Sequence, residues 1–325
     1  MVKTTVVIPN YNGIDYLKEC LRSLYLIRDS HMFDIIVIDN GSEDGSADLV
    51  AKEYPDVMLI RLKENTGFAA AVNRGIEHTK TDYVLLLNND IKVRDNFVKA
   101  LEECMDSDNK LFSVNSVMLS MADPDVLDGA GDYYCALGWA FAYKKGKPAK
   151  PVIDRGDRNI FSACGGASIY RMSALKETGL FDEAHFAYLE DTDLGYRARI
   201  LGYKSRYTAS AVCEHAGSGY SGSRYNEFKI SLSSRNNIYL IFKNMPFLQF
   251  IINLPFLIIG YLIKILFFTL KGFGKTYIKG LGEGFKLAFS AEGRKKHVRF
   301  KAANTFNYIC IQFELWANMF RRIIG

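Results

Sequence analysis

The segment at residues 4–13, TTVVIPNYNG, joins a short β-branched run to a polar turn that contains Pro, Asn and Gly. Such a run favours a buried strand, and the residues that follow it favour a turn. The next segment, residues 14–26, places Leu17, Leu21 and Leu24 on one face of a helix. The start of the chain therefore predicts a strand, a turn and a helix in direct succession.

The same order of signals repeats over the following residues. Further strands are predicted at residues 33–39, 57–62 and 83–88, and further helices at residues 44–52 and 67–79. Strands that alternate with helices imply right-handed crossovers and a mostly parallel sheet. Because these strands are almost continuously apolar, we expect helices on both faces of the sheet. The predicted fold class is α/β.

The middle of the chain is less regular. Residues 111–163 combine Gly, Asp and aromatic residues, which we interpret as an antiparallel strand pair with long loops that line a site. Elsewhere, helices are expected near residues 93–104, 173–178 and 192–201, and a strand is expected at residues 207–213.

Composition excludes several classes of protein. The chain has 325 residues, of which 49% are hydrophobic and 24% charged, so it is neither disordered nor collagen-like. Its net charge of +5 is too small to indicate a nucleic acid partner, and none is expected. The six cysteines form no CxxC pair and no zinc-module spacing, which predicts reduced thiols. No signal peptide is visible, so we expect the active part to face the cytoplasm.

Polar turns follow three of the predicted strands, and parallel sheets bind ligands where their strands end. The chain has no GxGxxG in the first turn and no GxxxxGK[ST], so a bound diphosphate needs another source of positive charge. Asp90, which follows strand 83–88, is suited to hold Mg²⁺ or Mn²⁺ against two phosphate oxygens. Its alternative role is the N-cap of helix 93–104. Asp39 ends an apolar strand, where a nucleotide or its own turn would supply hydrogen bonds.

The densest group of acidic residues lies in residues 179–202, GLFDEAHFAYLEDTDLGYRARILG. Four carboxylates crowd the start of a predicted helix: Asp182, Glu190, Asp191 and Asp193. Acidic residues favour a helix N-terminus, and a cap would explain one of them. A carboxylate beside the rings of Phe186 and Tyr188 is expected to have a raised pKa and to serve as a general base.

Together these segments resemble glycosyltransferase family 2, which has the GT-A fold and inverts the anomeric centre. The similar motifs, in order across residues 4–215, are VVIPNYNG (6–13), IDNGSEDGS (38–46), ENTGFAAAVNRGI (64–76), LNND (87–90), GGASIYRMSALKETGLFDE (165–183) and the Glu-Asp pair at 190–191. The resemblance implies a glycosyltransferase of the hexosyl-transferring type that uses a nucleotide-diphosphate sugar and a divalent metal. One departure is that Asn88 replaces the first acid of the family's Asp-x-Asp motif, so Asp90 must supply most of the metal binding.

Carried over position by position, the resemblance implies a set of roles. The residues implied to contact the nucleotide or the donor are Pro9, Asn12, Asp39, Ser42, Asn73, Asn88 and Gly166. The catalytic pair corresponds to Glu190 and Asp191, with Asp191 as the general base. Asp90 would bind the metal. His215 would reach the metal or the diphosphate, and its alternative is a structural role.

Within the family, the metal motif and the chain length resemble bacterial rhamnosyltransferases of O-antigen and cell-wall polysaccharide synthesis. This implies dTDP-rhamnose as the donor, with UDP-hexoses and UDP-N-acetylhexosamines as alternatives. A non-catalytic membrane-bound scaffold would lose Asp90 or Asp191, and both are present. A nucleotidyltransferase would need a glycine- and arginine-rich loop, which residues 9–13 are not. Arg224 and Arg235 are expected either to pair with phosphates or to be solvated surface charges.

The chain changes in character after residue 235. Residues 246–270 are long enough to cross a bilayer, although Asn253, Pro255 and Lys264 interrupt the apolar run. The basic residues that follow suit an anionic membrane surface. We expect interfacial helices at the cytoplasmic face of the plasma membrane, peripheral or monotopic, near a lipid-linked glycan acceptor. A single span and a buried helical subdomain are the alternatives. The predicted organisation is a GT-A catalytic domain at residues 1–235 and a membrane-associating helical region at residues 236–325.

Overall fold

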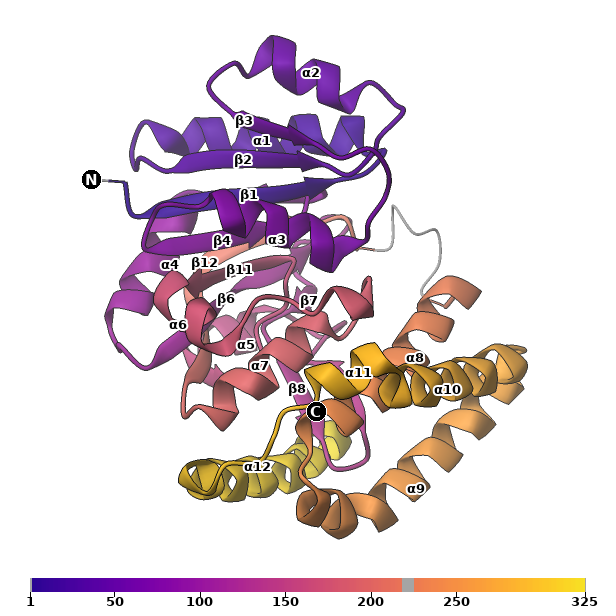
Figure 1. The fold of residues 1–325 in the computed structure, drawn as a ribbon. Helices are drawn as coiled ribbons and strands as arrows, with labels where there is room; N and C mark the ends of the chain where they lie inside the picture. Colours follow the sequence, from indigo (N-terminus) through magenta and orange to yellow (C-terminus); the bar gives the residue numbers. More distant parts are fainter. Residues whose placement is uncertain (1, 218–224, 325) are drawn as a thin grey trace.

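The computed structural model describes residues 2–217 and 225–324, and its fold is drawn in Figure 1. Within these residues ten strands form one sheet, and two more form a separate hairpin. The strands are β1 (Thr4–Asn10), β2 (Asp34–Asp39), β3 (Met58–Arg61), β4 (Tyr83–Leu87), β5 (Ile91–Val93), β6 (Leu111–Ser120), β7 (Leu127–Gly129), β8 (Asp132–Cys135), β9 (Trp139–Ala142), β10 (Arg158–Ile160), β11 (Ala167–Arg171) and β12 (Lys204–His215).

The main sheet runs in the order β10-β12-β6-β11-β4-β1-β2-β3, with β5 beside β12 and β7 beside β6. The strands β3, β2, β1 and β4 are parallel to one another, as predicted. The other half of the sheet is mixed, because β11 is antiparallel to both β4 and β6. Asn10 of β1 pairs with Asp39 of β2, so the carboxyl ends of these strands meet at one edge.

Helices cover both faces of the parallel half. The helices are α1 (Ile14–Arg28), α2 (Ser46–Glu53), α3 (Phe68–His78), α4 (Phe97–Asp106), α5 (Lys150–Ile153), α6 (Met172–Thr178), α7 (Glu190–Ile200), α8 (Glu227–Asn244), α9 (Phe247–Leu270), α10 (Gly274–Phe289), α11 (Ala291–Lys296) and α12 (Thr305–Ile324). Alternate side chains of β1 point to opposite faces. Val6 and Ile8 pack in a core with α1, α2 and α4, whereas Val7 packs in a core with α3.

Two sequence-based expectations are wrong in the middle of the chain. Residues 111–120 form β6, a long strand inside the main sheet, rather than irregular structure. Its polar residues broke the hydrophobic pattern, yet they are buried and paired: the hydroxyls of Ser113 and Ser205 lie 2.8 Å apart, and Asn115 accepts from the Cys164 amide at 2.7 Å. The helix expected at residues 93–104 begins only at Phe97, because residues 91–93 form β5 against β12. The expected antiparallel pair is β8–β9.

The chain after β12 folds into α8–α12, which lie along the lower and right-hand side of the view in Figure 1. The predicted division after residue 235 falls inside α8, which is one continuous helix. α8 packs on α7 and α10, and α12 packs on α7 and β8, so the helical region contacts the sheet domain through several elements. Among the described helices, α9 is long and apolar enough to cross a membrane.

Candidate active site

A cavity of about 600 Å³ lies where the carboxyl ends of β1 and β4 face the start of α7. This volume is within the range of about 300–1,000 Å³ that is usual for small-molecule sites. Turns after β1, β2 and β4, the loop before β11, the segment before α7, and α8 all contribute to its lining. Six of the predicted site residues line it: Pro9, Asn88, Asp90, Gly166, Glu190 and Asp191.

Three other predicted residues lie together beside the cavity without lining it. The backbone N–H of Asn12 donates to the Ser42 hydroxyl at 3.0 Å, and the backbone N–H of Ser42 donates to Oδ2 of Asp39 at 3.2 Å. Asp39 is buried and also accepts from the side chain of Asn10, at 3.4 Å. The turn following β2 and the side chain of Asn10 in β1 therefore each supply one hydrogen bond to Asp39.

Asn73 and Arg235 have structural partners. The side chain of Asn73 bonds both backbone groups of Phe181, donating to the carbonyl at 2.9 Å and accepting from the amide at 3.1 Å. It fastens α3 to the loop before α7 and does not line the cavity. The guanidinium of Arg235 donates to the carbonyl oxygens of Ala184 and His185. Arg224 lies outside the described residues.

Asp90 follows β4 and is only 8% exposed. One of its carboxylate oxygens, Oδ2, lies 3.3 Å from Nε2 of His215. The other, Oδ1, is buried and has no hydrogen-bond partner within the described part of the chain. The neighbour of Asp90, Ile91, pairs with His215 across β5 and β12, which brings the two side chains together. Asp90 therefore precedes a strand, and its alternative role as a helix cap is wrong.

Asp128 of β7 completes this group, although its role was not foreseen from the sequence. Its Oδ2 lies 2.7 Å from Nδ1 of His215, and its Oδ1 lies 2.8 Å from the ammonium of Lys145. Burial lowers the pKa of His215, but the bonds to Asp128 and Asp90 outweigh it and raise that pKa to about 9. Burial raises the pKa of Asp128, but His215 and Lys145 outweigh it and lower that pKa to about 2.

The segment before α7 has an unusual backbone. Phe186, Tyr188 and Leu189 all have positive φ, of 63°, 70° and 68°. Residues other than glycine seldom adopt this conformation, and such strain concentrates at functional sites. Gly67 at the start of α3 permits the close approach, because a Cβ there would lie 2.6 Å from the carbonyl oxygen of Phe186. The strained segment delivers Glu190 and Asp191 to the cavity at the first turn of α7.

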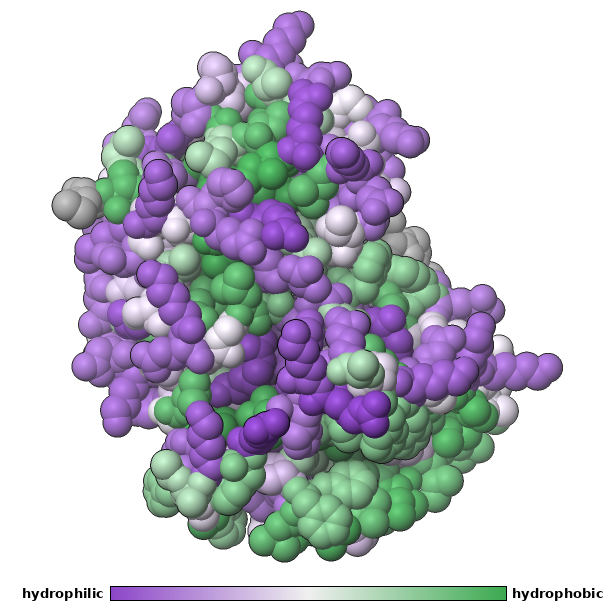
Figure 2. Space-filling model, in the orientation of Figure 1, coloured by the Kyte–Doolittle hydropathy of each residue, from purple (hydrophilic) through white to green (hydrophobic). Residues whose placement is uncertain are grey.

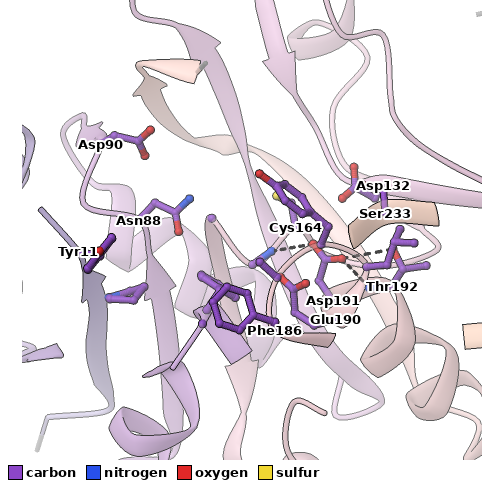
Figure 3. Close-up of a pocket in the computed structure, with 18 of the residues that line it drawn as sticks. Tyr11, Asn88, Asp90, Asp132, Cys164, Phe186, Glu190, Asp191, Thr192 and Ser233 are labelled. Carbon is purple, nitrogen blue, oxygen red and sulfur yellow. Dashed lines mark hydrogen bonds between the residues drawn. The ribbon is translucent and has the colours of Figure 1, made fainter. Parts of the chain in front are cut away.

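Figure 3 shows Asp191 and Glu190 across the cavity from Asp90 and Asn88. The Asp191 carboxylate accepts from the amides of Gly165 at 3.2 Å and Thr192 at 2.6 Å. Burial raises the pKa of Asp191, and these two hydrogen bonds oppose the rise. Burial and the charge of Asp191 raise the pKa of Glu190 further above its ordinary value. Oε2 of Glu190 has no hydrogen-bond partner in the described residues.

Asp132 is a third carboxylate in the same cavity, and no sequence signal marked it. Carboxylate oxygens of Asp132 and Asp191 and the sulfur of Cys164 lie within 4.8 Å of one another. Burial, followed by the charge of Asp191, raises the pKa of Asp132 to about 8. Asp132 is therefore mostly protonated at neutral pH.

The other two acids of the predicted cluster belong to a buried ion network. The ammonium of Lys243 lies 2.7 Å from Asp182 and 2.8 Å from Asp193. Burial raises the pKa of both carboxyls, but the charge of Lys243 outweighs it and holds both well below the usual range. With His185 these two acids have the spacing of a metal site, but Lys243, Lys296 and Arg197 already form ion pairs with them. The network joins α7 to α8.

Two groups lining or bordering the cavity offer ligands for a divalent cation. In the group of Asp132, Asp191 and Cys164, burial keeps the pKa of the thiol well above its ordinary value, and a protonated thiol is a poor ligand. Asp90 offers an unpaired buried oxygen and lies beside an imidazole, and this donor set suits Mn²⁺ or Mg²⁺ better. Asp128 would orient the imidazole through its second nitrogen, a common arrangement behind metal-binding histidines.

Comparison with known protein families and sequences places the chain among glycosyltransferases. The model of the family described as glycosyl transferase family 2 matches residues 5–179. The N-acetylglucosaminyl-diphospho-decaprenol L-rhamnosyltransferase of Mycobacterium tuberculosis is 27% identical over 235 residues, which are 65% of this chain and 75% of that protein.

Solved structures share the fold. Staphylococcus aureus TarS matches with a TM-score of 0.59 and 17% identity; the match covers 90% of this chain but only 50% of TarS. The mannosyltransferase PcManGT from Pyrobaculum calidifontis, in complex with GDP-Man and Mn²⁺, matches with a TM-score of 0.52 and 17% identity, over 95% of this chain and 85% of that one. At such identities the likeness concerns the fold alone.

Proposed function

The chain belongs to glycosyl transferase family 2, and from that premise we propose that it transfers a sugar from a nucleotide-diphosphate donor to an acceptor hydroxyl, with inversion. One observation carries the proposal. Asp90, at the end of β4, and Asp191, at the start of α7, line one cavity from opposite sides. A site for inverting transfer needs this separation, because the leaving diphosphate and the attacking hydroxyl lie on opposite faces of the anomeric carbon.

Asp191 is the general base of the proposed reaction. The acceptor oxygen forms a bond to the anomeric carbon while the bond from that carbon to the diphosphate breaks, and the acceptor proton passes to the Asp191 carboxylate. The amides of Gly165 and Thr192 hold the carboxylate in place. Glu190 is buried, and burial and the charge of Asp191 raise its pKa well above the ordinary value, which favours the neutral form of this carboxyl beside the base.

Asp90 and His215 would hold the divalent cation, with Asp128 orienting the imidazole. When bound, Mn²⁺ or Mg²⁺ supplies electrostatic stabilisation to the departing diphosphate. Ligation by the imidazole requires its neutral form, so metal binding would displace the proton that His215 otherwise shares between two carboxylates. Asn88 and Gly166 border the donor sugar in this arrangement. The backbone N–H of Asn88 donates to the carbonyl oxygen of Gly166 at 2.8 Å.

The nucleotide is proposed to lie along the turns after β1 and β2. Pro9 lines the cavity there, and Asn12, Asp39 and Ser42 form the hydrogen-bonded group beside it. Asn40 also lines the cavity, and its side chain is held by Asn65 and Thr66. These polar groups suit a nucleobase and a ribose, because a buried polar site favours a ligand that forms hydrogen bonds with its donors and acceptors.

Rhamnose from dTDP-rhamnose is the donor sugar that we favour, and a lipid-linked glycan is the acceptor. The name of the mycobacterial relative supports both parts, since it specifies L-rhamnosyl transfer to a decaprenol-linked N-acetylglucosamine. Release of nucleoside diphosphate from a panel of dTDP-rhamnose, UDP-hexoses and UDP-N-acetylhexosamines would identify the donor. If UDP were released from a UDP sugar in a metal-dependent way, and no diphosphate were released from dTDP-rhamnose, the donor would instead belong to the UDP-sugar class.

The Asp132→Asn variant is expected to change the pH profile of transfer. In the wild type Asp132 loses its proton near pH 8, which adds a second negative charge beside Asp191. That charge raises the proton affinity of the base, so we expect kcat to rise through this pH. Asparagine cannot ionise, and the variant should reach its plateau at lower pH, without the inflection. Steady-state kcat between pH 6 and about 9.5 would test this; an unchanged inflection in the variant would assign it to another group.

α9 is proposed to bind the chain to a membrane surface. Its polar residues form one stripe that faces the body: Gln249 accepts from the Tyr196 hydroxyl at 2.7 Å, and the side chains of Asn253 and Gln312 exchange hydrogen bonds at 2.8 Å. Further along the same stripe, the carbonyl oxygen of Gly260 accepts from the indole of Trp139. The helix therefore lies flat on the body for several turns. This arrangement favours a helix that lies in the membrane interface over one that spans the membrane.

The opposite face of α9 is apolar and joins other exposed apolar side chains. Figure 2 shows this hydrophobic surface along the lower edge of the molecule. Its members include Leu248, Ile259, Leu262, Leu266 and Leu270 of α9, Ile278, Phe285 and Phe289 of α10, and Phe306, Ile309, Phe313 and Phe320 of α12. So many exposed apolar groups indicate an interaction surface. The exposed Lys271, Lys275, Lys279 and Lys286 favour an anionic bilayer, as at the cytoplasmic face of the plasma membrane.

Membrane attachment is expected to be peripheral or monotopic. The full chain should sediment with phosphatidylglycerol vesicles and be released by alkaline sodium carbonate, because α9 would lie in the interface. A double variant, Ile259→Glu with Leu266→Glu, should remain in the supernatant, since it places two charges on the apolar face. Leu26→Glu, at an exposed position of α1, is the matched control and should sediment like the wild type. Resistance of the wild type to carbonate would instead indicate a span.

A further inference from the structure

A second cavity lies between α8, α9 and α10, and we refer to it as the helical cavity. Its volume is about 600 Å³, and its walls are almost entirely apolar. Ile241 and Leu257 line its buried part, at 5% and 3% exposure. Phe247 and Leu262 line it while being 80% and 59% exposed, so it opens onto the hydrophobic surface.

The polar groups at the helical cavity already have partners. The hydroxyl of Tyr261 accepts from the side chain of Asn237 at 3.1 Å, and Nδ1 of His297 lies 2.7 Å from the carbonyl oxygen of Phe242. Little is left to hold water in a cavity of this size, and apolar cavities without polar partners stay dry. An apolar chain is the ligand that matches such a lining.

Two elements run from the active-site cavity to the helical cavity. α8 lines the first with Phe228 and Ser233, and the second with residues from Ile238 onward. The β8–β9 hairpin lines the first through β9, and its turn residue Gly138 packs against Leu257, a lining residue of the second, from which an added Cβ would lie 3.1 Å. A ligand with a glycan in one cavity and an apolar chain in the other would therefore contact the same two elements.

We propose that the helical cavity binds the prenyl chain of a lipid-linked acceptor whose glycan enters the active-site cavity. The inference rests on the proposed function, because it assumes that an acceptor glycan reaches Asp191. A single-chain prenyl lipid suits the cavity better than a bilayer phospholipid. A phospholipid would have to seat two acyl chains at a cavity of about 600 Å³, whereas the prenyl lipid of the proposed acceptor seats only one. Exposed Lys286 and Arg294, on α10 and α11, offer charge for the diphosphate of such a lipid.

Photoaffinity labelling of the full chain on phosphatidylglycerol vesicles would test the proposal. One probe is farnesyl diphosphate that carries a benzophenone at the end of its chain, and the other is phosphatidylglycerol with a benzophenone on one acyl chain. We expect the farnesyl probe to label peptides that line the helical cavity, from α8, α9 and α10. The phosphatidylglycerol probe should label the exposed faces of α9 and α12. Unlabelled farnesyl diphosphate should compete with the first probe and not with the second.

Substitutions that fill the cavity provide the matched comparison. Leu254→Trp and Leu281→Trp add bulk from opposite walls, on α9 and α10, and each should reduce farnesyl labelling of the cavity peptides at least about tenfold. Leu26→Trp makes the same change at an exposed site on α1 and should leave labelling unchanged. Vesicle sedimentation and thermal unfolding would verify that the filled variants are folded, and the competition in the wild type tests the claim without any substitution.

Three results would overturn the inference: no labelling of the cavity peptides by the farnesyl probe, equal labelling in the filled variants, or equal labelling of the cavity by the phosphatidylglycerol probe. The last result would assign the cavity to bilayer lipid. Failure of the proposed function is a separate observation, because release of nucleoside diphosphate from the donor, and its dependence on Asp191, can be measured without any lipid probe.

Discussion

The Asp191→Asn variant is expected to fold like the wild type and to lose sugar transfer by about 10²–10⁴-fold, the range for loss of a general base. Asparagine keeps the shape of the side chain, and its single amide oxygen can accept from one of the backbone amides of Gly165 and Thr192, which donate to different oxygens of the Asp191 carboxylate. It cannot accept the proton of the acceptor hydroxyl. The loss should therefore appear in kcat, while the affinity for the nucleotide, measured by calorimetry or thermal shift, stays near that of the wild type.

Two further variants separate the role of Asp191 from general effects of charge. Glu190→Gln replaces a buried carboxyl whose pKa is already raised well above its ordinary value by burial and by Asp191. Because the raised pKa favours the neutral carboxyl, the neutral isostere should cost much less activity than Asp191→Asn. Asp154→Asn, at the exposed residue that follows α5, should have no effect. Wild-type turnover in Asp191→Asn would remove Asp191 from the mechanism.

Removal of the divalent cation has the second large expected effect. Treatment with EDTA should abolish transfer, and Mn²⁺ or Mg²⁺ should restore it. Asp90→Asn should lower kcat by about 10²–10³-fold, as does the loss of one major electrostatic contact to a leaving or developing anion. The matched control is Asp95→Asn, an exposed aspartate shortly after β5. Undiminished transfer in EDTA, by the wild type and by Asp90→Asn alike, would contradict a metal at this position.

Asp128→Asn gives a graded test of the same site. The side chain of Asp128 fixes the ring of His215 from the side opposite Asp90. Loss of such a partner behind a metal ligand usually weakens metal affinity by about 10–100-fold. A Mn²⁺ titration of activity should therefore shift to higher concentration and reach a similar plateau. Lys145→Met removes the other partner of Asp128 without touching His215 and should shift the titration far less.

The parallel half of the fold was predictable because local signals and tertiary structure agree there. The runs that end at Asn10, Asp39 and Leu87 are short, apolar and closed by turn residues, and each becomes a strand of the sheet. The family resemblance was carried by the same segments and is confirmed by the family match at residues 5–179. Asp90 could be named for this reason, because it follows the run that ends at Leu87. Asp191 lies beyond the matched residues and was named from the Glu-Asp pair of the resemblance, and both residues line the cavity.

The rest of the site depends on contacts between distant residues that no local pattern records. Asp128 reaches His215 across a separation of 87 residues, and Asp132 meets Asp191 only because β8 packs beside α7. Asn73 shows the opposite case, since it sits in a segment similar to the family yet turns its side chain to the Phe181 loop. Motif position predicted which segments gather, but not which side chain of a segment faces the cavity.

The polar residues of α9 show a similar limit. From the sequence, Asn253 and Lys264 weakened the case for a membrane helix. In the structure Asn253 is buried against Gln312 of α12, and the ammonium of Lys264 lies 5.9 Å from the centre of the Trp139 ring. The polar stripe is therefore used for packing on the body, which leaves the apolar face outward. The spacing of the polar residues along α9 already placed them on one face of the helix. That this face packs on the body could be seen only once the surface it contacts was known.

The most direct test of the central claim is the anomeric configuration of the glycoside that the chain forms from its donor, measured by proton NMR. Prenyl-diphosphate-linked N-acetylglucosamine would serve as the acceptor, with Mn²⁺ present. Single displacement with Asp191 as the base predicts one new glycosidic bond whose configuration is opposite to that of the donor sugar. Retention of the donor configuration, or hydrolysis of every donor tested without any glycoside, would contradict the proposed function.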